Sequence, residues 1–205
     1  MSFDALYPIF LVGASGVGKT SLIIKYVDDV FNLDLKSNVG IDYITKDVSV
    51  EEEEIRLQIW DTAGQEKFQI SISSFSIYKN AKAFIIVFDL TNEDSLQEVY
   101  NYLLEINNSY KSDILIVLVG NKCDLENQFE NLEEKIKEIS NEKEFKLFKT
   151  SAKEKINVNE LFYYIAKTLK EKFPQNENSN KDKPKRHSRK IIFEQEKKEK
   201  KKNCC

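Results

Sequence analysis

The chain has 205 residues, of which 41% are hydrophobic and 32% are charged, and its formal net charge is −3. That is enough apolar material to bury one core, so no second large domain is required. No apolar stretch approaches the roughly 20 residues that cross a bilayer, and residues 1–10 lack the basic start of a secretion signal. The three cysteines indicate no disulfide framework. We therefore expect a protein of a reducing compartment that does not span a membrane.

The first expected element is a short strand over the apolar run 9–12, and the segment 13–20, GASGVGKT, follows it directly. This segment matches the pattern GxxxxGK[ST] and precedes the apolar residues 22–24 of an expected helix. Its glycines let successive backbone N–H groups point inward, and the helix adds its positive N-terminal dipole. The segment therefore predicts a phosphate site, in which Lys19 reaches the terminal phosphates of a nucleoside triphosphate and Thr20 ligates magnesium. The expected nucleotide contacts here are Gly13, Ser15, Gly16, Val17, Gly18, Lys19, Thr20 and Ser21.

The stretch 41–59 contains a run of four glutamates and predicts two antiparallel strands joined by a charged turn. Its second strand leads into the segment 60–65, WDTAGQ, which falls at the carboxyl end where open α/β sheets bind ligands. We expect Asp61 to hold the magnesium, Gly64 to close an unobstructed N–H on a terminal phosphate, and Gln65 to orient an attacking water. Taken by itself, the segment would also suit an ordinary turn.

Two later runs, 83–88 and 114–119, are apolar at every position, as expected of central strands that are covered on both faces. Helical spacing of apolar residues appears within 96–106, 132–139 and 161–169. Alternating strands and helices of this kind predict an α/β fold of the phosphate-loop type. We expect a six-stranded, mostly parallel sheet with helices on both faces.

The motif NKCD at 121–124 follows the apolar run 114–119, and TSAK at 150–153 follows residues 145–148, so both are expected at strand ends. The Asp124 carboxylate can accept two parallel N–H bonds from the edge of guanine, whereas adenine presents no such pair of donors. Either motif alone is more often a polar loop, but their order after a phosphate loop favours a guanine nucleotide. The expected base contacts are Asn121, Lys122, Asp124, Ser151, Ala152 and Lys153.

The composition changes after residue 173. Residues 174–205 contain 11 Lys and Arg against 5 Asp and Glu, a net charge of +6, which leaves 20 against 29 in the rest of the chain. Such a polar stretch cannot offset its ordering entropy by burial. We therefore expect one domain over 1–173 and a flexible basic tail over 174–205. A basic tail can bind nucleic acid, act as a nuclear address or approach an anionic membrane.

Cys204 and Cys205 end the sequence and decide among these roles of the tail. Neighbouring cysteines do not readily form a disulfide with each other, and two thiolates make an incomplete zinc site. We therefore favour lipidation over an unmodified tail, and we expect no nucleic-acid partner.

These motifs together resemble the small GTPases of the Ras superfamily, and most closely the Rab family. The Rab likeness is carried by VGIDY at 39–43, RLQIWDTAGQEKF at 56–68, IYKNA at 77–81 and the terminal cysteine pair. It covers nearly the whole chain. It implies a GTP-binding, slowly hydrolysing switch of vesicle and membrane trafficking, with Lys19 and Gln65 as catalytic residues and magnesium bound beside GTP or GDP.

The resemblance also implies partners and a location. The expected partners are an exchange factor, a GTPase-activating protein, a GDP-dissociation inhibitor, escort proteins and effectors that bind the GTP state, with the protein itself a monomer. Geranylgeranyl groups on Cys204 and Cys205 would anchor the chain, since two lipids hold a membrane more stably than one. The expected location is the cytoplasmic face of endomembranes or of the plasma membrane, with a soluble cytosolic pool.

Four aromatic positions take their roles from the same resemblance. Phe31 lies at the family spacing for stacking on the guanine base, although an aromatic side chain there would equally suit the core. Tyr43, Trp60 and Phe75 match a patch that effectors contact, and the alternative is that all three are half-buried packing residues.

One position departs from the family pattern. Asn38 stands where the family places a threonine whose hydroxyl ligates magnesium and whose N–H meets the terminal phosphate. An amide oxygen can also ligate a hard cation, but in Asn38 it lies one bond further out. Ser37 would substitute if the loop slipped by one residue. The alternative function is therefore a Rab-like nucleotide-binding scaffold with impaired switching or hydrolysis.

Overall fold

The computed structural model describes residues 3–29, 42–62, 76–110, 114–125, 131–139 and 145–174. The chain divides into two units, Met1–Pro174 and Gln175–Cys205, and every described residue belongs to the first. The expected basic tail lies outside the described residues, so its character stays a prediction. None of the described helices is both long enough and apolar enough to cross a membrane.

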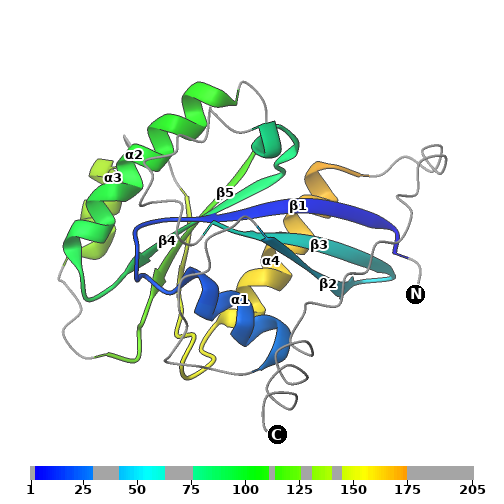
Figure 1. The fold of residues 1–205 in the computed structure, drawn as a ribbon, viewed down its shortest axis with the longest axis horizontal. Helices are drawn as coiled ribbons and strands as arrows, with labels where there is room; N and C mark the ends of the chain where they lie inside the picture. The colour runs from blue at the N-terminus through cyan, green and yellow to red at the C-terminus, as the bar shows by residue number, and fades with distance from the viewer. Residues whose placement is uncertain are drawn as a thin grey trace, which may run out of the picture. The chain divides into compact units, whose positions relative to one another are not determined.

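Six strands form one sheet in the order β2-β3-β1-β4-β5-β6 (Figure 1). The strands are β1 (Ala5–Val12), β2 (Asp42–Val50), β3 (Glu53–Asp61), β4 (Ala83–Asp89), β5 (Leu115–Asn121) and β6 (Lys146–Lys149). β2 runs antiparallel to β3, and the other neighbouring strands of this sheet pair in parallel. The expected six-stranded, mostly parallel sheet is confirmed.

Helices cover both faces of the sheet (Figure 1). α1 (Lys19–Asp28) and α4 (Val158–Lys172) pack on one face, and α2 (Glu93–Ser109) and α3 (Leu132–Ile139) pack on the other. The alternation of side chains along β1 explains this arrangement. Ile9 and Leu11 belong to the core under α1 and α4, whereas Phe10 and Val12 belong to the core under α2 and α3. Each face of the sheet therefore has its own apolar cluster.

The two apolar runs expected as central strands are β4 and β5. Every residue of β4 is buried, and β5 has only one position of intermediate exposure. The helical stripes are also buried as predicted, in α2 and in α4. The buried stripe residues are Leu96, Val99, Leu103 and Ile106 of α2 and Leu161, Ile165 and Leu169 of α4.

The charged turn between β2 and β3 is shorter than expected. β3 begins at Glu53, which pairs with Val50, so only Glu51 and Glu52 form the turn. Lys170 of α4 explains the difference, because its Nζ lies 2.8 Å from a carboxylate oxygen of Glu51 and 3.3 Å from one of Glu53. This cation offsets the repulsion between Glu51 in the turn and Glu53 at the start of the strand.

The end of α4 is fixed to the amino edge of the sheet. The Tyr7 hydroxyl, near the start of β1, donates a 2.7 Å hydrogen bond to the carbonyl of Phe173. The ammonium of Lys82, just before β4, lies 4.4 Å from the centroid of the Phe173 ring. The last described residues therefore lie beside the starts of the central strands.

The opposite, carboxyl edge of the sheet positions the candidate site. β1 lies between β3 and β4. The strands after β1 are therefore added first on one side of it and then on the other, so the strand order reverses at β1. Ligands of open α/β sheets bind beyond the carboxyl ends of the strands at such a reversal point. The loop after β1 is the segment expected to bind phosphate.

Candidate nucleotide-binding site

The loop between β1 and α1 has a backbone that only glycine accommodates at two positions. Gly13 and Gly18 have φ angles of 143° and 98°. A Cβ on Gly13 would lie 2.0 Å from the Val87 carbonyl oxygen, and one on Gly18 would lie 2.4 Å from the Asn121 side-chain nitrogen. The loop thus passes directly over the ends of β4 and β5. The absence of side chains leaves the backbone N–H groups open to an anion.

Lys19 is the first residue of α1 and is only 3% exposed. Its Nζ donates hydrogen bonds of 2.8 Å and 2.7 Å to the carbonyls of Gly13 and Ala14. These bonds hold the ammonium against the start of the loop. Because a buried cation is costly unless it is paired, a phosphate bound here would be favoured by the Lys19 charge and by the helix N-terminus. Thr20 and Ser21 follow in the same first turn.

Two oxygen ligands meet beside this loop. The Thr20 hydroxyl donates a 2.6 Å hydrogen bond to a carboxylate oxygen of Asp61, the last residue of β3. The Thr62 hydroxyl donates a 2.6 Å bond to the Leu11 carbonyl, which ties the end of β3 to β1. Hydroxyl and carboxylate oxygens suit Mg²⁺, which typically takes one or two carboxylates together with phosphate oxygens. Within the described ranges, no group of three or more His, Cys, Asp and Glu gathers as a separate metal site.

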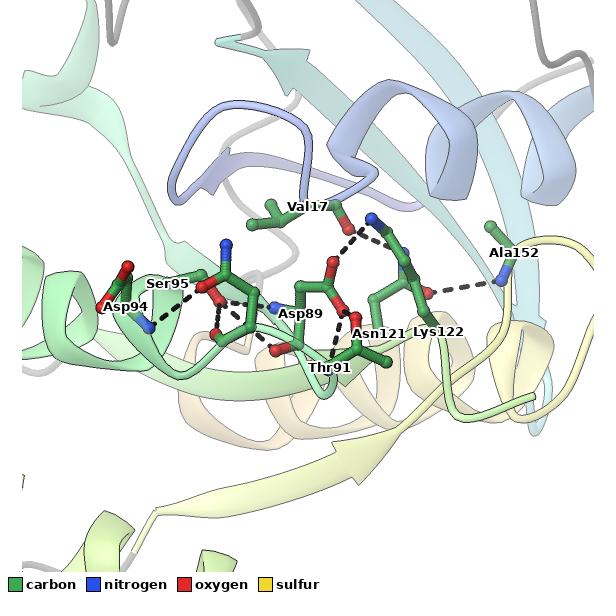
Figure 2. Close-up of polar contacts among 9 residues, drawn as sticks. Val17, Asp89, Thr91, Asp94, Ser95, Asn121, Lys122 and Ala152 are labelled. Carbon is green, nitrogen blue, oxygen red and sulfur yellow. Dashed lines mark hydrogen bonds and ion pairs between the residues drawn. The ribbon is translucent and has the colours of Figure 1, made fainter. Parts of the chain in front are cut away.

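Asn121 connects three segments on the other side of the site (Figure 2). Its side chain is buried, and its Nδ2 donates a 2.8 Å hydrogen bond to the Val17 carbonyl in the glycine loop. Its Oδ1 accepts hydrogen bonds from the Thr150 hydroxyl at 3.1 Å and from the Ala152 N–H at 3.3 Å. The expected phosphate and base segments therefore share one hydrogen-bond network.

The remaining expected base contacts lie in the loops after β5 and β6. The Asp124 side chain is only 10% exposed, and its carboxylate lies 3.9 Å from the ammonium of Lys153. The Ser151 hydroxyl accepts a 3.0 Å bond from the Glu154 N–H, and Ser151 forms a backbone bridge with Ile156. These contacts fix the loop that contains Ala152, and the Asp124 carboxylate expected to contact the base lies beside it.

The sequence reasoning missed Asp89, the last residue of β4. This residue is only 6% exposed, and its carboxylate lies 2.6 Å from the ammonium of Lys122. Burial alone would raise the pKa of Asp89, but hydrogen bonds from Lys122 and Thr91 outweigh it and hold that pKa below its ordinary value. A usable signal was present, because Asp89 directly follows the apolar run 83–88 and so falls at a strand end.

Two of the three expected patch residues lie side by side at the edge of the sheet. Tyr43 is 41% exposed, and its ring centroid lies 4.6 Å from that of Trp60, its partner in the β2–β3 register. Trp60 also stacks on Phe10 at 5.6 Å. Tyr43 is therefore available on the surface, whereas Trp60 is partly a packing residue.

Several predicted site residues fall in ranges that the structure does not describe, and their roles stay predictions. They are Phe31, Asn38, Gly64, Gln65, Phe75, Cys204 and Cys205.

The glycine loop, the strand-end aspartate and the asparagine-centred loops together define a phosphate-loop protein of the small GTPase class. Residues 8–171 match the model of the Ras family, and the chain belongs to that family. Within it, the chain is a Rab-type small GTPase, as three curated relatives show.

The first relative is the Ras-related protein Rab-10 of Diplobatis ommata, 38% identical over 176 residues that cover 86% of this chain and 87% of the relative. The second, Rab-13 of Rattus norvegicus, is 36% identical over 183 residues, or 89% of each chain. The third, Rab-8A of Rattus norvegicus, is 33% identical over 196 residues that cover 96% of this chain and 94% of the relative. This chain accordingly binds guanine nucleotide, hydrolyses GTP and acts in membrane trafficking.

Proposed function

We propose that this Rab-type GTPase is a magnesium-dependent switch whose nucleotide lies along the carboxyl edge of the sheet, with its phosphates over the glycine loop and its base over the Asn121 network. The observation that carries the proposal is the contact between Thr20 and Asp61. It brings two hard oxygen ligands from α1 and β3 to the side of a loop that is built for phosphate. These residues, far apart in the sequence, meet here because β1, which precedes Thr20, and β3, which ends at Asp61, run parallel to the same edge of the sheet.

In this proposal, Thr20 and Asp61 hold the magnesium ion. When bound, the ion neutralises negative charge that develops on the terminal phosphates. Lys19 and the loop N–H groups bind the same phosphates and stabilise charge on the leaving group. Gln65 orients the attacking water, and Asp124 accepts the two N–H groups of the guanine edge. No covalent intermediate with the protein is needed, because positioning and electrostatics are sufficient.

The switch consists of two loops, residues 32–42 and 64–77, which the terminal phosphate orders and hydrolysis releases. Both begin or end next to the site. The first runs into β2 at Asp42, whose register partner is Asp61, and the second follows β3 closely. Loss of the terminal phosphate can therefore act directly on both loops, because each loop adjoins a strand end at the site. Tyr43 and Trp60 lie between the two loops in the sequence and are assigned, with Phe75, to the surface that effectors contact in the GTP state.

Membrane attachment comes from the other end of the chain. We assign it to geranylgeranyl groups on Cys204 and Cys205 and to the basic residues of 174–205, which an anionic leaflet attracts. The corresponding partners are escort proteins for lipidation and a GDP-dissociation inhibitor for the cytosolic pool. An exchange factor and a GTPase-activating protein control the cycle between the GDP-bound and GTP-bound states. The protein acts as a monomer on the cytoplasmic face of endomembranes or of the plasma membrane.

A single-turnover measurement tests the switch. The full-length protein is loaded with GTP and magnesium, and release of inorganic phosphate is followed beside the Gln65→Leu and Gln97→Leu variants. Gln97 lies exposed on α2, so the second variant makes the same substitution outside the site. We expect slow release from the wild-type protein and from Gln97→Leu, and release from Gln65→Leu slower by about 10-fold or more, as for loss of a positioned catalytic group.

The opposite outcome has a defined meaning. If the wild-type protein retains GTP for many hours and Gln65→Leu behaves identically, the hydrolysing switch is wrong, and Asn38 becomes the residue to examine. If the protein retains neither GTP nor GDP, the proposed site itself is wrong.

A further inference from the structure

A buried carboxylate at the end of β4 contacts the expected base-binding loop. β4 and β5 run parallel and in register, with Asp89 opposite Asn121, so Lys122 follows directly at the same edge of the sheet. Figure 2 shows the ion pair between Lys122 and Asp89. The Lys122 ammonium lies 2.6 Å from the Asp89 carboxylate. The Asp89 side chain is 8% exposed and that of Lys122 is 34% exposed. The carboxylate of this pair is therefore buried, whereas the lysine is partly exposed.

The backbone of Lys122 is held in an uncommon conformation. Its φ angle is 64°, in the left-handed region that side-chain-bearing residues adopt only when their surroundings fix them. The neighbouring backbone supplies part of that fixation, because the Leu125 N–H donates to the Lys122 carbonyl at 3.1 Å and the Cys123 N–H donates to the Thr150 carbonyl at 2.9 Å. The ion pair with Asp89 fixes the side chain as well.

The Asp89 carboxylate is itself held in a single orientation (Figure 2). Its Oδ1 accepts hydrogen bonds from the Thr91 N–H at 2.9 Å and from the Thr91 hydroxyl at 2.7 Å, which leaves Oδ2 for Lys122. The Asp89 N–H donates a 2.9 Å bond to the Ser95 hydroxyl oxygen in the first turn of α2. The position of Lys122 is thus set by the turn that leads into α2, outside the loops that contact nucleotide.

We infer that Asp89 is a positioning residue for guanine nucleotide: it fixes the Lys122 side chain and, through it, the loop 121–124, and so slows nucleotide release. The inference rests on the base site described above as the proposed function. Asparagine cannot replace the carboxylate, because its single acceptor oxygen must serve either Thr91 or Lys122. The NH₂ group of the asparagine then faces the N–H or O–H donors of whichever of Thr91 and Lys122 is left without the oxygen.

The test measures release of a fluorescent GDP from the full-length protein in the presence of excess unlabelled GDP. We expect Asp89→Asn to accelerate release about tenfold, the effect of losing a charge-assisted hydrogen bond that is partly open to solvent. Asp94→Asn is the matched control, because Asp94 is exposed in the first turn of α2 and carries the same charge. The control is expected to change release by less than about twofold, as for other exposed charges.

A double-mutant cycle separates positioning from a general loss of structure. Lys122→Met is made in the wild-type and in the Asp89→Asn background, and the four release rates are compared. If Asp89 acts through Lys122, Asp89→Asn adds little once Lys122 is gone. The inference is wrong if Asp89→Asn accelerates release by the same factor with and without Lys122→Met. It is also wrong if Asp89→Asn does not accelerate release.

A second variant keeps the inference testable should Asp89→Asn fail to fold. Thr91→Val removes the hydroxyl that orients the carboxylate and is expected to accelerate release several-fold in the wild-type background alone. Unchanged release from this variant would contradict the inference. If the wild-type protein binds no GDP, the proposed function fails instead, and the two failures are thereby distinguished.

Discussion

The two halves of the nucleotide site are built in different ways. The loop of the phosphate half is built on its backbone, and Gly13 and Gly18 lie against atoms that leave no room for a Cβ. The base half consists of side chains, with Asn121 holding three segments by neutral hydrogen bonds and Asp89 holding Lys122 by charge. The first half is therefore most sensitive to atoms added at Gly13 and Gly18, whereas the second is most sensitive to the loss of buried polar atoms.

Gly13→Ala tests the phosphate half and should have the largest effect. The new Cβ would lie 2.0 Å from a carbonyl oxygen at a φ angle of 143°, so the loop or β4 must move. We expect the free energy of unfolding to fall by about 4 kcal/mol or more, as for other severe backbone clashes. Urea unfolding at one fixed GDP concentration measures it.

Gly16→Ala is the control for that experiment. Gly16 has a φ angle of 78°, but a Cβ added there would meet open space, so only the backbone conformation is penalised. The expected loss is about 1 to 2 kcal/mol. If both variants lose the same free energy of unfolding, the close contact between Gly13 and β4 does not account for the effect of Gly13→Ala.

Asn121→Ala tests the base half and should have the next largest effect. It leaves the Val17 carbonyl, the Thr150 hydroxyl and the Ala152 N–H without their partner. A buried group left unsatisfied costs about 1 to 3 kcal/mol, so we expect GDP affinity to fall about 100-fold. Equilibrium titration with fluorescent GDP measures this fall. Asn101→Ala, on the exposed side of α2, should leave the affinity unchanged.

Lys153→Ala should have the smallest effect of the three. Its side chain is 57% exposed and its ammonium lies 3.9 Å from Asp124, a geometry worth about 0 to 1 kcal/mol. The same titration should therefore show a change of less than about fivefold. A loss as large as that of Asn121→Ala would mean that the base half depends on exposed charge more than on buried neutral hydrogen bonds.

Much of the fold and part of the site follow from the sequence. Apolar runs and helical spacing predicted the parallel sheet and its helices, because a strand buried on both faces is apolar throughout and a helix buried on one face is apolar at helical spacing. The rule that polar residues after a strand lie at one edge placed Asp61 and Asn121 at the ends of β3 and β5. That placement explains why motifs separated by tens of residues form one site.

Other features depend on contacts that the sequence does not encode locally. Glu53, at the start of β3, is paired with Lys170 of α4, far along the chain. The bond from Asn121 to Val17 uses a backbone carbonyl, which no sequence motif marks. Asp89 falls at a strand end, as its sequence position indicates, but it belongs to none of the motifs, and its partner Lys122 is known only from the structure.

The attachment of Phe173 to Tyr7 and Lys82 has a mechanical consequence. Tyr7 precedes Gly13 by six residues of extended chain, or roughly 20 Å along β1. A force applied to the chain beyond Phe173 would therefore load the starts of β1 and β4 first, along their length. Strands hydrogen-bonded on both sides resist such shear, so tension from an anchored tail would reach the nucleotide loops strongly attenuated.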